Sequence, residues 1–310
     1  MRCALVTGAT GHLGRELCRQ LADREIEVHG ITRQPDAKAF NGNLQLHRID
    51  GQTQTIVELA RDIRPDTIFH LAAYVRRDHG SDDVARLVEA NVLLGTQLLE
   101  AMRLSGADRI IVAGTYLQHA DNDNYRALNL YAATKQAFEA ILEFYADAFR
   151  IRSLRLTLGN IYSEHDPGSS LIVQIADAWQ RNTALHLREP QLLIDPIHVE
   201  DAAAAFIHAA DLMEQASLPT DRAVPRFSVT GGRDVSPAEL IGLFEQLSDR
   251  RVSVTPGSPP TAPRRVPPWR GITLPGWKPR LTLRDGVARI IASRGNARTE
   301  SINQDKSRTR

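Results

Sequence analysis

Two residues that could do acid–base chemistry stand four positions apart in the middle of the chain. Tyr131 and Lys135 open an apolar stretch that continues through Phe138 and Tyr145, and residues four apart on a helix share one face. A phenol has a pKa of about 10, so it exchanges protons poorly at neutral pH unless a neighbouring ammonium favours the phenolate. The pair is therefore a candidate general acid and base, in which Lys135 lowers the pKa of Tyr131.

A turn with three glycines near the start of the chain is the second chemical feature. A short apolar run ending at Thr7 leads into Gly8, Gly11 and Gly14. Gly8 permits a tight exit from a strand, Gly11 lets the backbone approach a pyrophosphate, and Gly14 allows close packing of a helix on the strand. The glycines could be turn chemistry alone, but the flanking strand and helix favour a dinucleotide site. The expected cofactor contacts in this turn are Thr7, Gly8, Thr10, Gly11, His12, Leu13 and Gly14.

The glycine spacing resembles that of the extended branch of the short-chain dehydrogenase/reductase superfamily, the NAD-dependent epimerase/dehydratase family, which acts largely on nucleotide sugars. The resemblance covers about residues 1 to 292, because Thr115 at a strand end and the pair Tyr131 and Lys135 follow the turn in the family's order. It implies that these three residues are catalytic, that the Thr115 hydroxyl donates to a substrate oxygen, and that Tyr131 and Lys135 also touch the cofactor. Thr115 could instead be a strand-end threonine that caps the next turn.

The residue after the second predicted strand bears on the choice of cofactor. Arg33 follows the strand 27–32 at the place where an acidic residue would receive the ribose hydroxyls of NAD. A basic residue there suits the 2′-phosphate of NADP, although Arg33 could also be one more solvated arginine. We therefore expect NADP (NADPH) to be favoured over NAD. The resemblance implies further cofactor contacts at Asp50, Gly51, Leu71, Ala72, Ala73 and Asn91.

Asn91 has two possible roles, because an amide on the inner side of a helix must satisfy its hydrogen bonds. It either anchors backbone near the active site, as the resemblance implies, or is a core amide bonded to a neighbouring loop. Nothing in the sequence separates these alternatives.

The residues after the candidate threonine bear on the reaction. Sugar-nucleotide 4,6-dehydratases place Asp-Glu after their threonine, whereas this chain has Tyr116-Leu117, so dehydration is disfavoured. Asn160 resembles the family's asparagine that meets the nucleotide diphosphate, although Ser163 replaces the usual glycine nearby. His198 is expected to be a structural hydrogen-bonding residue. The substrate contacts that the resemblance implies are Thr115, Tyr116 and Asn160.

Three functions remain open. The first is NADPH-dependent reduction of the 4-keto group of a nucleoside-diphosphate 4-keto-6-deoxysugar, with Tyr131 as the general acid. The second is a nucleotide-sugar 4-epimerase with tightly bound NAD, for which an acidic residue would be expected at the position of Arg33. The third is a non-catalytic dinucleotide-sensing protein, which the presence of Thr115, Tyr131 and Lys135 argues against.

The elements that must position these residues alternate between strands and helices. This alternation over residues 1–158 predicts an α/β fold with a doubly wound parallel sheet, a Rossmann dinucleotide-binding domain. A looser, proline-rich stretch at 159–292 is expected to form a smaller, irregular C-terminal substrate lobe, while the family would return a strand near 226–230 to the main sheet. The polar tail 293–310 is expected to be disordered.

Composition excludes several classes of protein. The 310 residues carry a net charge of +1 and 42% hydrophobic residues, so we expect no nucleic-acid or membrane partner. No apolar run is long enough to span a membrane, and a strand follows Met1 almost directly, so we expect a cytoplasmic protein. Cys3 and Cys18 are interpreted as packing residues, and no metal is expected. The long apolar helices 82–104 and 131–150 suggest a homodimer.

Overall fold

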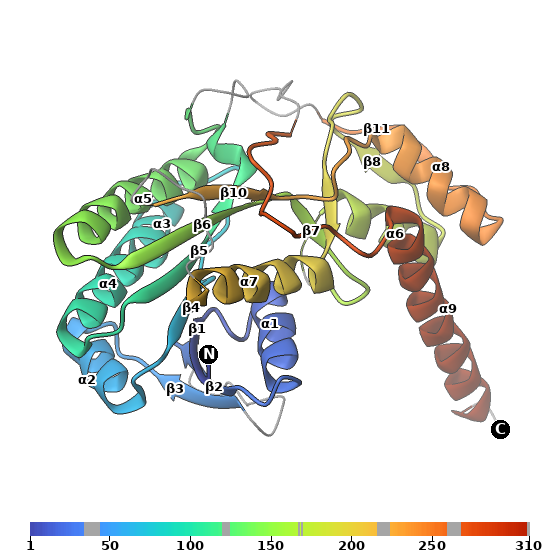
Figure 1. Ribbon diagram of the computed structural model, residues 1–310. Coiled ribbons are helices and arrows are strands. Elements are labelled where there is room, and N and C mark those ends of the chain that lie inside the picture. The colour runs from blue at the N-terminus through green and yellow to red at the C-terminus, as the bar shows by residue number, and fades with distance from the viewer. Residues whose placement is uncertain are drawn as a thin grey trace. The chain divides into compact units, whose positions relative to one another are not determined.

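The computed structural model divides the chain into two compact units (Figure 1). The first unit contains Met1–Leu158, Ala202–Val229 and Trp269–Lys278, and the second contains Gly159–Asp201, Thr230–Pro268 and Pro279–Arg310. The residues that the structure describes are 1–33, 44–119, 125–166, 168, 170–215, 224–258 and 268–308.

The first unit is built on a seven-stranded sheet in which every pair of neighbours is parallel. Its strand order is β10-β6-β5-β4-β1-β2-β3, so the direction of winding reverses between β1 and β4. In such sheets ligands bind at the carboxyl ends of the strands beside this reversal. The predicted doubly wound sheet is confirmed. The strands are β1 Cys3–Thr7, β2 Glu27–Thr32, β3 Leu44–Arg48, β4 Thr67–His70, β5 Arg109–Thr115, β6 Arg152–Leu158 and β10 Arg226–Val229.

Helices cover both faces of this sheet (Figure 1). On one face, apolar side chains of α2, α4 and α5 form a core with residues such as Ile68 of β4 and Val112 of β5. On the other face, Phe69 of β4 packs edge-on against Phe206 of α7, because successive side chains of a strand point to opposite faces. The helices of this unit are α1 His12–Ala22, α2 Thr53–Ile63, α3 Asp83–Val88, α4 Leu94–Ser105, α5 Leu130–Phe149 and α7 Val199–Glu214, which begins in the second unit.

Between α3 and α4 the backbone does not stay α-helical. The single helix expected over 82–104 is interrupted by a π-helical turn, η1, at Glu89–Leu93. A π-helical turn bulges the helix locally, and such bulges are frequent at functional sites. Asn91 lies in it.

The second unit has two short parallel strand pairs and three helices among its described residues. Strand β7 (Asn160–Tyr162) pairs with β9 (Pro196–His198), and β8 (Leu185–Leu187) pairs with β11 (Val254–Pro256). Their core is formed with α6 (Leu171–Arg181), α8 (Pro237–Ser248) and α9 (Leu283–Arg308). The helical backbone of α9 runs through most of the stretch 293–310, for which the sequence predicts disorder. None of the described helices has the length and apolarity needed to cross a membrane.

Candidate active site

The glycine turn leaves no room for a side chain at Gly8 or Gly14, and little room at Gly11. Gly8 has a φ of +73°, and a Cβ there would lie 2.8 Å from the Ala72 nitrogen. A Cβ on Gly14 would lie 2.0 Å from the Gly8 carbonyl oxygen, and one on Gly11 would lie 3.1 Å from it. Since α1 begins at His12 with Gly11 as its N-cap, this close-packed turn presents the start of the helix to the carboxyl end of β1.

Thr7 joins the turn to the neighbouring strand β4. Its hydroxyl hydrogen bonds to Nδ1 of His70 at 2.8 Å and accepts from the Ala72 N–H at 3.2 Å, while its carbonyl accepts from the Leu71 N–H. These contacts fix the path of residues 71 and 72, which with residue 73 are the cofactor contacts that the family resemblance implies. Leu71 and Ala72 are partly buried there and Ala73 is exposed.

His70 is a buried ionisable residue that the sequence analysis missed. Its side chain has no exposed surface, and burial, helped by the charge of Lys135, lowers its pKa to about 3. The imidazole is therefore neutral at pH 7, and it packs edge-on against Phe138 of α5. A histidine at the end of an otherwise apolar strand was the available signal.

The three predicted catalytic residues meet at the carboxyl end of β5 and the start of α5. Asn129 caps α5 by accepting from the Ala132 N–H at 2.8 Å, which puts Tyr131 and Lys135 in the first turns of the helix. Thr115, the last residue of β5, lies near enough to the Tyr131 phenol for its hydroxyl to influence the pKa of Tyr131. All three residues are buried, with Tyr131 only 8% exposed.

Burial shifts the two ionisable groups of this site toward neutrality. It raises the pKa of Tyr131 to about 12, against smaller lowering effects of the Arg77 charge and of the nearby Thr115 hydroxyl. It lowers the pKa of Lys135 to about 8, and among the described residues no acceptor lies within hydrogen-bond distance of its Nζ atom. The pKa of Tyr131 therefore moves opposite to the expected lowering by Lys135, because desolvation of the phenolate outweighs nearby charges.

Thr115 also performs the capping role that the sequence left open. It begins a 3₁₀ turn, η2 (Tyr116–Gln118), in which its hydroxyl accepts from the Leu117 N–H at 3.3 Å. The Gln118 side chain accepts in return from the Thr115 N–H at 2.9 Å. This reciprocal pair fixes both the backbone and the side chain of Thr115. Tyr116, the predicted substrate contact in this turn, is partly buried.

A buried polar network behind Thr115 was also missed by the sequence analysis. The Gln118 amide donates to the Tyr125 hydroxyl at 2.7 Å, and that hydroxyl donates to Glu139 of α5. Arg155 of β6 donates to the same carboxylate at 2.9 Å, and both charged side chains are 2% exposed. Burial raises the pKa of Glu139, while Arg155 opposes the rise. The network connects β6 and α5 to the backbone of Thr115.

Asn91 uses its amide within the protein. It donates to the Tyr74 carbonyl and to the Thr134 hydroxyl, both at 3.0 Å, and accepts from the Tyr74 N–H at 2.8 Å. The side chain is completely buried. These bonds hold the loop at Tyr74 against α5 near the site, a geometry that fits both an amide that anchors backbone there and a core amide bonded to a neighbouring loop.

The residues predicted for the adenosine end lie side by side after β2 and β3. The Ile49 N–H donates to the Thr32 carbonyl at 3.1 Å, so Arg33 and Asp50 leave the sheet next to each other. Arg33 is exposed. Asp50 accepts from the Gln52 N–H at 2.9 Å, and this bond, the first of several causes, lowers its pKa. Gly51 accepts from the Gln97 amide at 2.7 Å.

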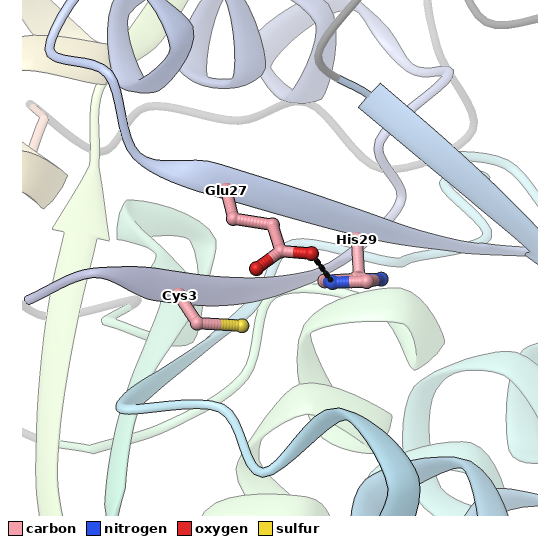
Figure 2. Close-up of side chains that lie close together, drawn as sticks. All are labelled: Cys3, Glu27 and His29. Carbon is pink, nitrogen blue, oxygen red and sulfur yellow. Dashed lines mark hydrogen bonds and ion pairs between the residues drawn. The ribbon is translucent and has the colours of Figure 1, made fainter.

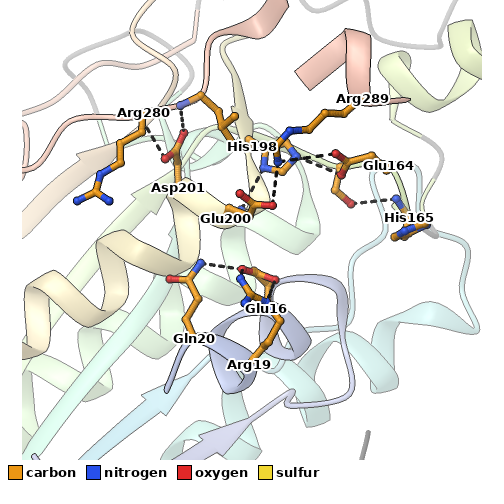
Figure 3. Close-up of polar contacts among 12 residues, drawn as sticks. Glu16, Arg19, Gln20, Glu164, His165, His198, Glu200, Asp201, Arg280 and Arg289 are labelled. Atoms are coloured by element: carbon orange, nitrogen blue, oxygen red, sulfur yellow. Dashed lines mark hydrogen bonds and ion pairs between the residues drawn. The ribbon is translucent and has the colours of Figure 1, made fainter. Parts of the chain in front are cut away.

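The remaining predicted residues belong to the second unit. Asn160 begins β7, where its N–H donates to the Asp195 carbonyl at 2.9 Å. His198 hydrogen bonds to Glu164 at 3.3 Å and accepts from the Glu200 N–H at 3.3 Å (Figure 3). Arg289 pairs with Glu200, and Asp201 accepts from the N–H groups of Arg280 and Leu281. His198 therefore lies in a network that joins β9 to α9.

Comparison with known proteins defines the class. The NAD dependent epimerase/dehydratase family matches residues 4–221, so the chain belongs to that family of short-chain dehydrogenase/reductase enzymes.

Individual relatives are distant but span nearly the whole chain. The dTDP-6-deoxy-L-talose 4-dehydrogenase (NAD(P)(+)) of Kitasatospora kifunensis is 24% identical over 94% of this chain and 95% of its own length. UDP-glucose 4-epimerase of Mycolicibacterium smegmatis is 25% identical over 93% and 96%. Among solved structures, the UDP-glucose 4-epimerase of Thermus thermophilus in complex with NAD superposes with a TM-score of 0.79 at 22% identity, covering 95% and 99% of the two chains.

Proposed function

We propose that the protein reduces the 4-keto group of a nucleoside-diphosphate 4-keto-6-deoxysugar with NADPH. The observation that carries the proposal is that Thr115, Tyr131 and Lys135 are all buried at the carboxyl end of β5 and the start of α5, with the Thr115 hydroxyl near enough to the Tyr131 phenol to influence its pKa. Two hydroxyls so placed can hold one carbonyl oxygen, and one of them can give it a proton.

The residues present fit a nicotinamide dinucleotide. The close-packed glycine turn leads into the start of α1, where unpaired N–H groups can hold a pyrophosphate, and the Lys135 ammonium is buried without a protein acceptor among the described residues. When bound, the nicotinamide supplies or accepts the hydride. We propose that the glycine turn binds the pyrophosphate, that Arg33 binds the 2′-phosphate, and that Asp50 and Gly51 lie beside the adenine. Lys135 would donate to an oxygen atom on the nicotinamide side of the cofactor.

The proton chemistry follows from burial. With a pKa raised to about 12, Tyr131 is protonated at neutral pH, as a proton donor must be. Lys135, with a pKa lowered to about 8, still carries its charge at pH 7. When Tyr131 gives its proton to the substrate oxygen, the phenolate left behind is stabilised by that ammonium and by the Thr115 hydroxyl.

The neighbouring residues support reduction over dehydration. Tyr116 and Leu117 stand where 4,6-dehydratases have an acidic pair, so no carboxylate follows Thr115 to eliminate water. We propose Tyr116 and Asn160 as substrate contacts. The relative from Kitasatospora kifunensis, a 4-dehydrogenase named for NAD(P)(+), supports oxidation and reduction at carbon 4.

A 4-epimerase with tightly held NAD is the second candidate. It is favoured by the full-length similarity to UDP-glucose 4-epimerases, one of which was solved with NAD. An epimerase interconverts two sugars and consumes no cofactor overall, whereas a reductase consumes one NADPH for each sugar.

The deciding experiment mixes the purified protein with NADPH and a nucleoside-diphosphate 4-keto-6-deoxysugar. We expect the NADPH absorbance to fall in step with formation of the 4-hydroxy sugar. Tyr131→Phe, which keeps the ring and removes the hydroxyl, is the matched control. It should oxidise NADPH only at a low residual rate. Interconversion of 4-epimers without loss of NADPH would establish the epimerase instead.

We also propose a homodimer through α3, η1, α4 and α5. Large apolar side chains exposed on this surface include Val88, Leu93 and Leu104 on the first helical stretch and Phe144 and Phe149 on α5, with Phe144 59% exposed. Exposed apolar side chains gathered on neighbouring helices are typical of an interface. Light scattering at micromolar concentration should give twice the chain mass, and a monomer mass would contradict the proposal.

A further inference from the structure

A second group of chemically active side chains lies at the opposite end of the same sheet, where β1 and β2 begin. Cys3, Glu27 and His29 each offer a possible ligand atom, and these three atoms lie within 4.8 Å of one another (Figure 2). The group is remote in the sheet from the glycine turn, which follows the other end of β1. Nothing in the proposed oxidoreductase chemistry uses it.

The register of the sheet brings these residues together. Cys3 is the partner of Glu27 across the parallel pair β1 and β2, so the two side chains stand next to each other on one face. His29 follows Glu27 by two residues on β2 and therefore points to the same face. Asp66 accepts from the Cys3 N–H at 3.0 Å and from the Arg2 N–H, which fixes the strand start that carries the thiol.

The three side chains of the cluster differ in exposure, and an ion can reach them from solvent on the side of Glu27. His29 is the buried member, with 8% of its side chain exposed, whereas the Glu27 side chain is 57% exposed and Cys3 is partly buried. The His29 Nε2 atom already faces the Glu27 carboxylate at 3.1 Å. Ligands of a tetrahedral zinc ion stand roughly 3.5 Å apart, so a small rotation of the flexible Glu27 side chain brings the three atoms to binding distance.

A fourth residue orients the histidine. The Nδ1 atom of His29 lies 2.8 Å from Nε2 of His47 on β3, and the two rings stack with centroids 5.1 Å apart. In the absence of a cation, Nε2–H donates to Glu27; when the proton is instead on Nδ1 and is donated to His47, Nε2 has a free lone pair with which it can bind a cation. Histidines that bind metals characteristically donate their second N–H to such a partner.

We propose that Cys3, Glu27 and His29 bind a divalent cation of the zinc class at the start of β1 and β2. One thiolate, one imidazole and one carboxylate suit zinc, whereas calcium and magnesium prefer oxygen ligands alone. The thiol proton leaves to solvent as the sulfur–metal bond forms, and water completes the coordination. Bound at the beginning of two neighbouring strands, the cation stabilises the folded first unit.

Cobalt(II) is the probe, since it takes zinc sites and its bond to a thiolate absorbs in the near ultraviolet. We titrate the full-length reduced protein with Co²⁺ and compare Cys3→Ser with Cys18→Ala, which removes a thiol buried in α1 and outside the cluster. We expect the thiolate band to saturate at one equivalent in wild type and Cys18→Ala, to be absent in Cys3→Ser, and to disappear when Zn²⁺ is added. A band that survives Cys3→Ser, or no band in wild type, overturns the proposal.

Two more variants test the coordination. Glu27→Gln changes an exposed side chain, so the fold should be kept while Zn²⁺ affinity falls. His47→Phe keeps a ring but removes the acceptor for His29, and a lost outer-shell partner weakens metal binding about ten- to a hundredfold. Competition between Zn²⁺ and a chromophoric chelator measures both constants. Unchanged affinity in Glu27→Gln and His47→Phe would show that the cation does not bind in this cluster.

Discussion

The two ends of one parallel sheet hold ionisable side chains in opposite ways. At the carboxyl end, Tyr131 and Lys135 are almost fully enclosed, and burial moves the pKa of each toward its neutral form. At the amino end, His29 is enclosed but Glu27 remains open to solvent. The first arrangement suits the transfer of a proton in a dry site, and the second suits the capture of a cation from water.

The strongest test of the carboxyl end is Tyr131→Phe. Removal of a general acid costs about a hundredfold to ten-thousandfold in rate, so we expect turnover to fall at least about a hundredfold. Fold and NADPH binding should be kept, as measured by circular dichroism and a binding titration. A wild-type rate in this variant would remove Tyr131 from the mechanism.

Lys135→Met should lose activity yet resist unfolding better at pH 7. The ammonium has a pKa of about 8 in the folded protein against 10.5 unfolded, a difference of about 2.5 units or roughly 3 kcal/mol of destabilisation. The unfolded chain binds the proton more tightly, so wild-type stability should rise with pH between these two values. Denaturation of wild type and Lys135→Met across that pH range measures the difference between their free energies of unfolding.

The predicted difference in stability between Lys135→Met and wild type depends on pH. The difference in stability should be largest below pH 8, shrink as the pH rises toward 10.5, and close above 10.5, where Lys135 is neutral in both the folded and the unfolded state. A variant that is less stable than wild type at pH 7 would show that Lys135 has a compensating partner in the folded protein.

Arg33→Ala tests the adenosine end of the same edge. A charge-assisted contact with the 2′-phosphate contributes about 1.5–3 kcal/mol, so NADPH binding should weaken about ten- to a hundredfold while NADH binding barely changes. Titrations of both cofactors against both proteins make the measurement. An equal loss for the two cofactors, or a wild type that prefers NADH, would leave Arg33 as a solvated arginine and favour the epimerase.

The smallest expected effect comes from the network behind Thr115. Tyr125→Phe removes the hydroxyl that links Gln118 to Glu139, and a net hydrogen bond of about 1 kcal/mol corresponds to roughly fivefold in kcat. NADPH affinity should be unchanged, because the network reaches Thr115 and not the glycine turn. The control is Tyr145→Phe, whose hydroxyl bonds Glu100 elsewhere on α5. Equal kcat values for the two variants would contradict a positioning role.

The sequence by itself determined the sheet and the order of its chemical residues. A Cβ at Gly14 would meet the Gly8 backbone of the same turn, so local spacing already predicts that turn, whereas the close contact at Gly8 comes from Ala72 after β4. Tyr131 and Lys135 are separated by one turn of a single helix, so their spacing in the sequence is also enough to place them on one face. The alternation of strands and helices limits the topology to a parallel sheet.

Only the tertiary structure decided which distant polar residues meet. Glu139 looks like an ordinary helix glutamate until β6 places Arg155 beside it, and Cys3 meets Glu27 only through the register of two strands. The partners of Asn91 also come from another element, the loop at Tyr74. The sequence also could not predict that the pKa of Tyr131 is raised, because desolvation depends on all the residues packed around the ring. Periodicity records which face a residue occupies, but not which residue from another element lies opposite it.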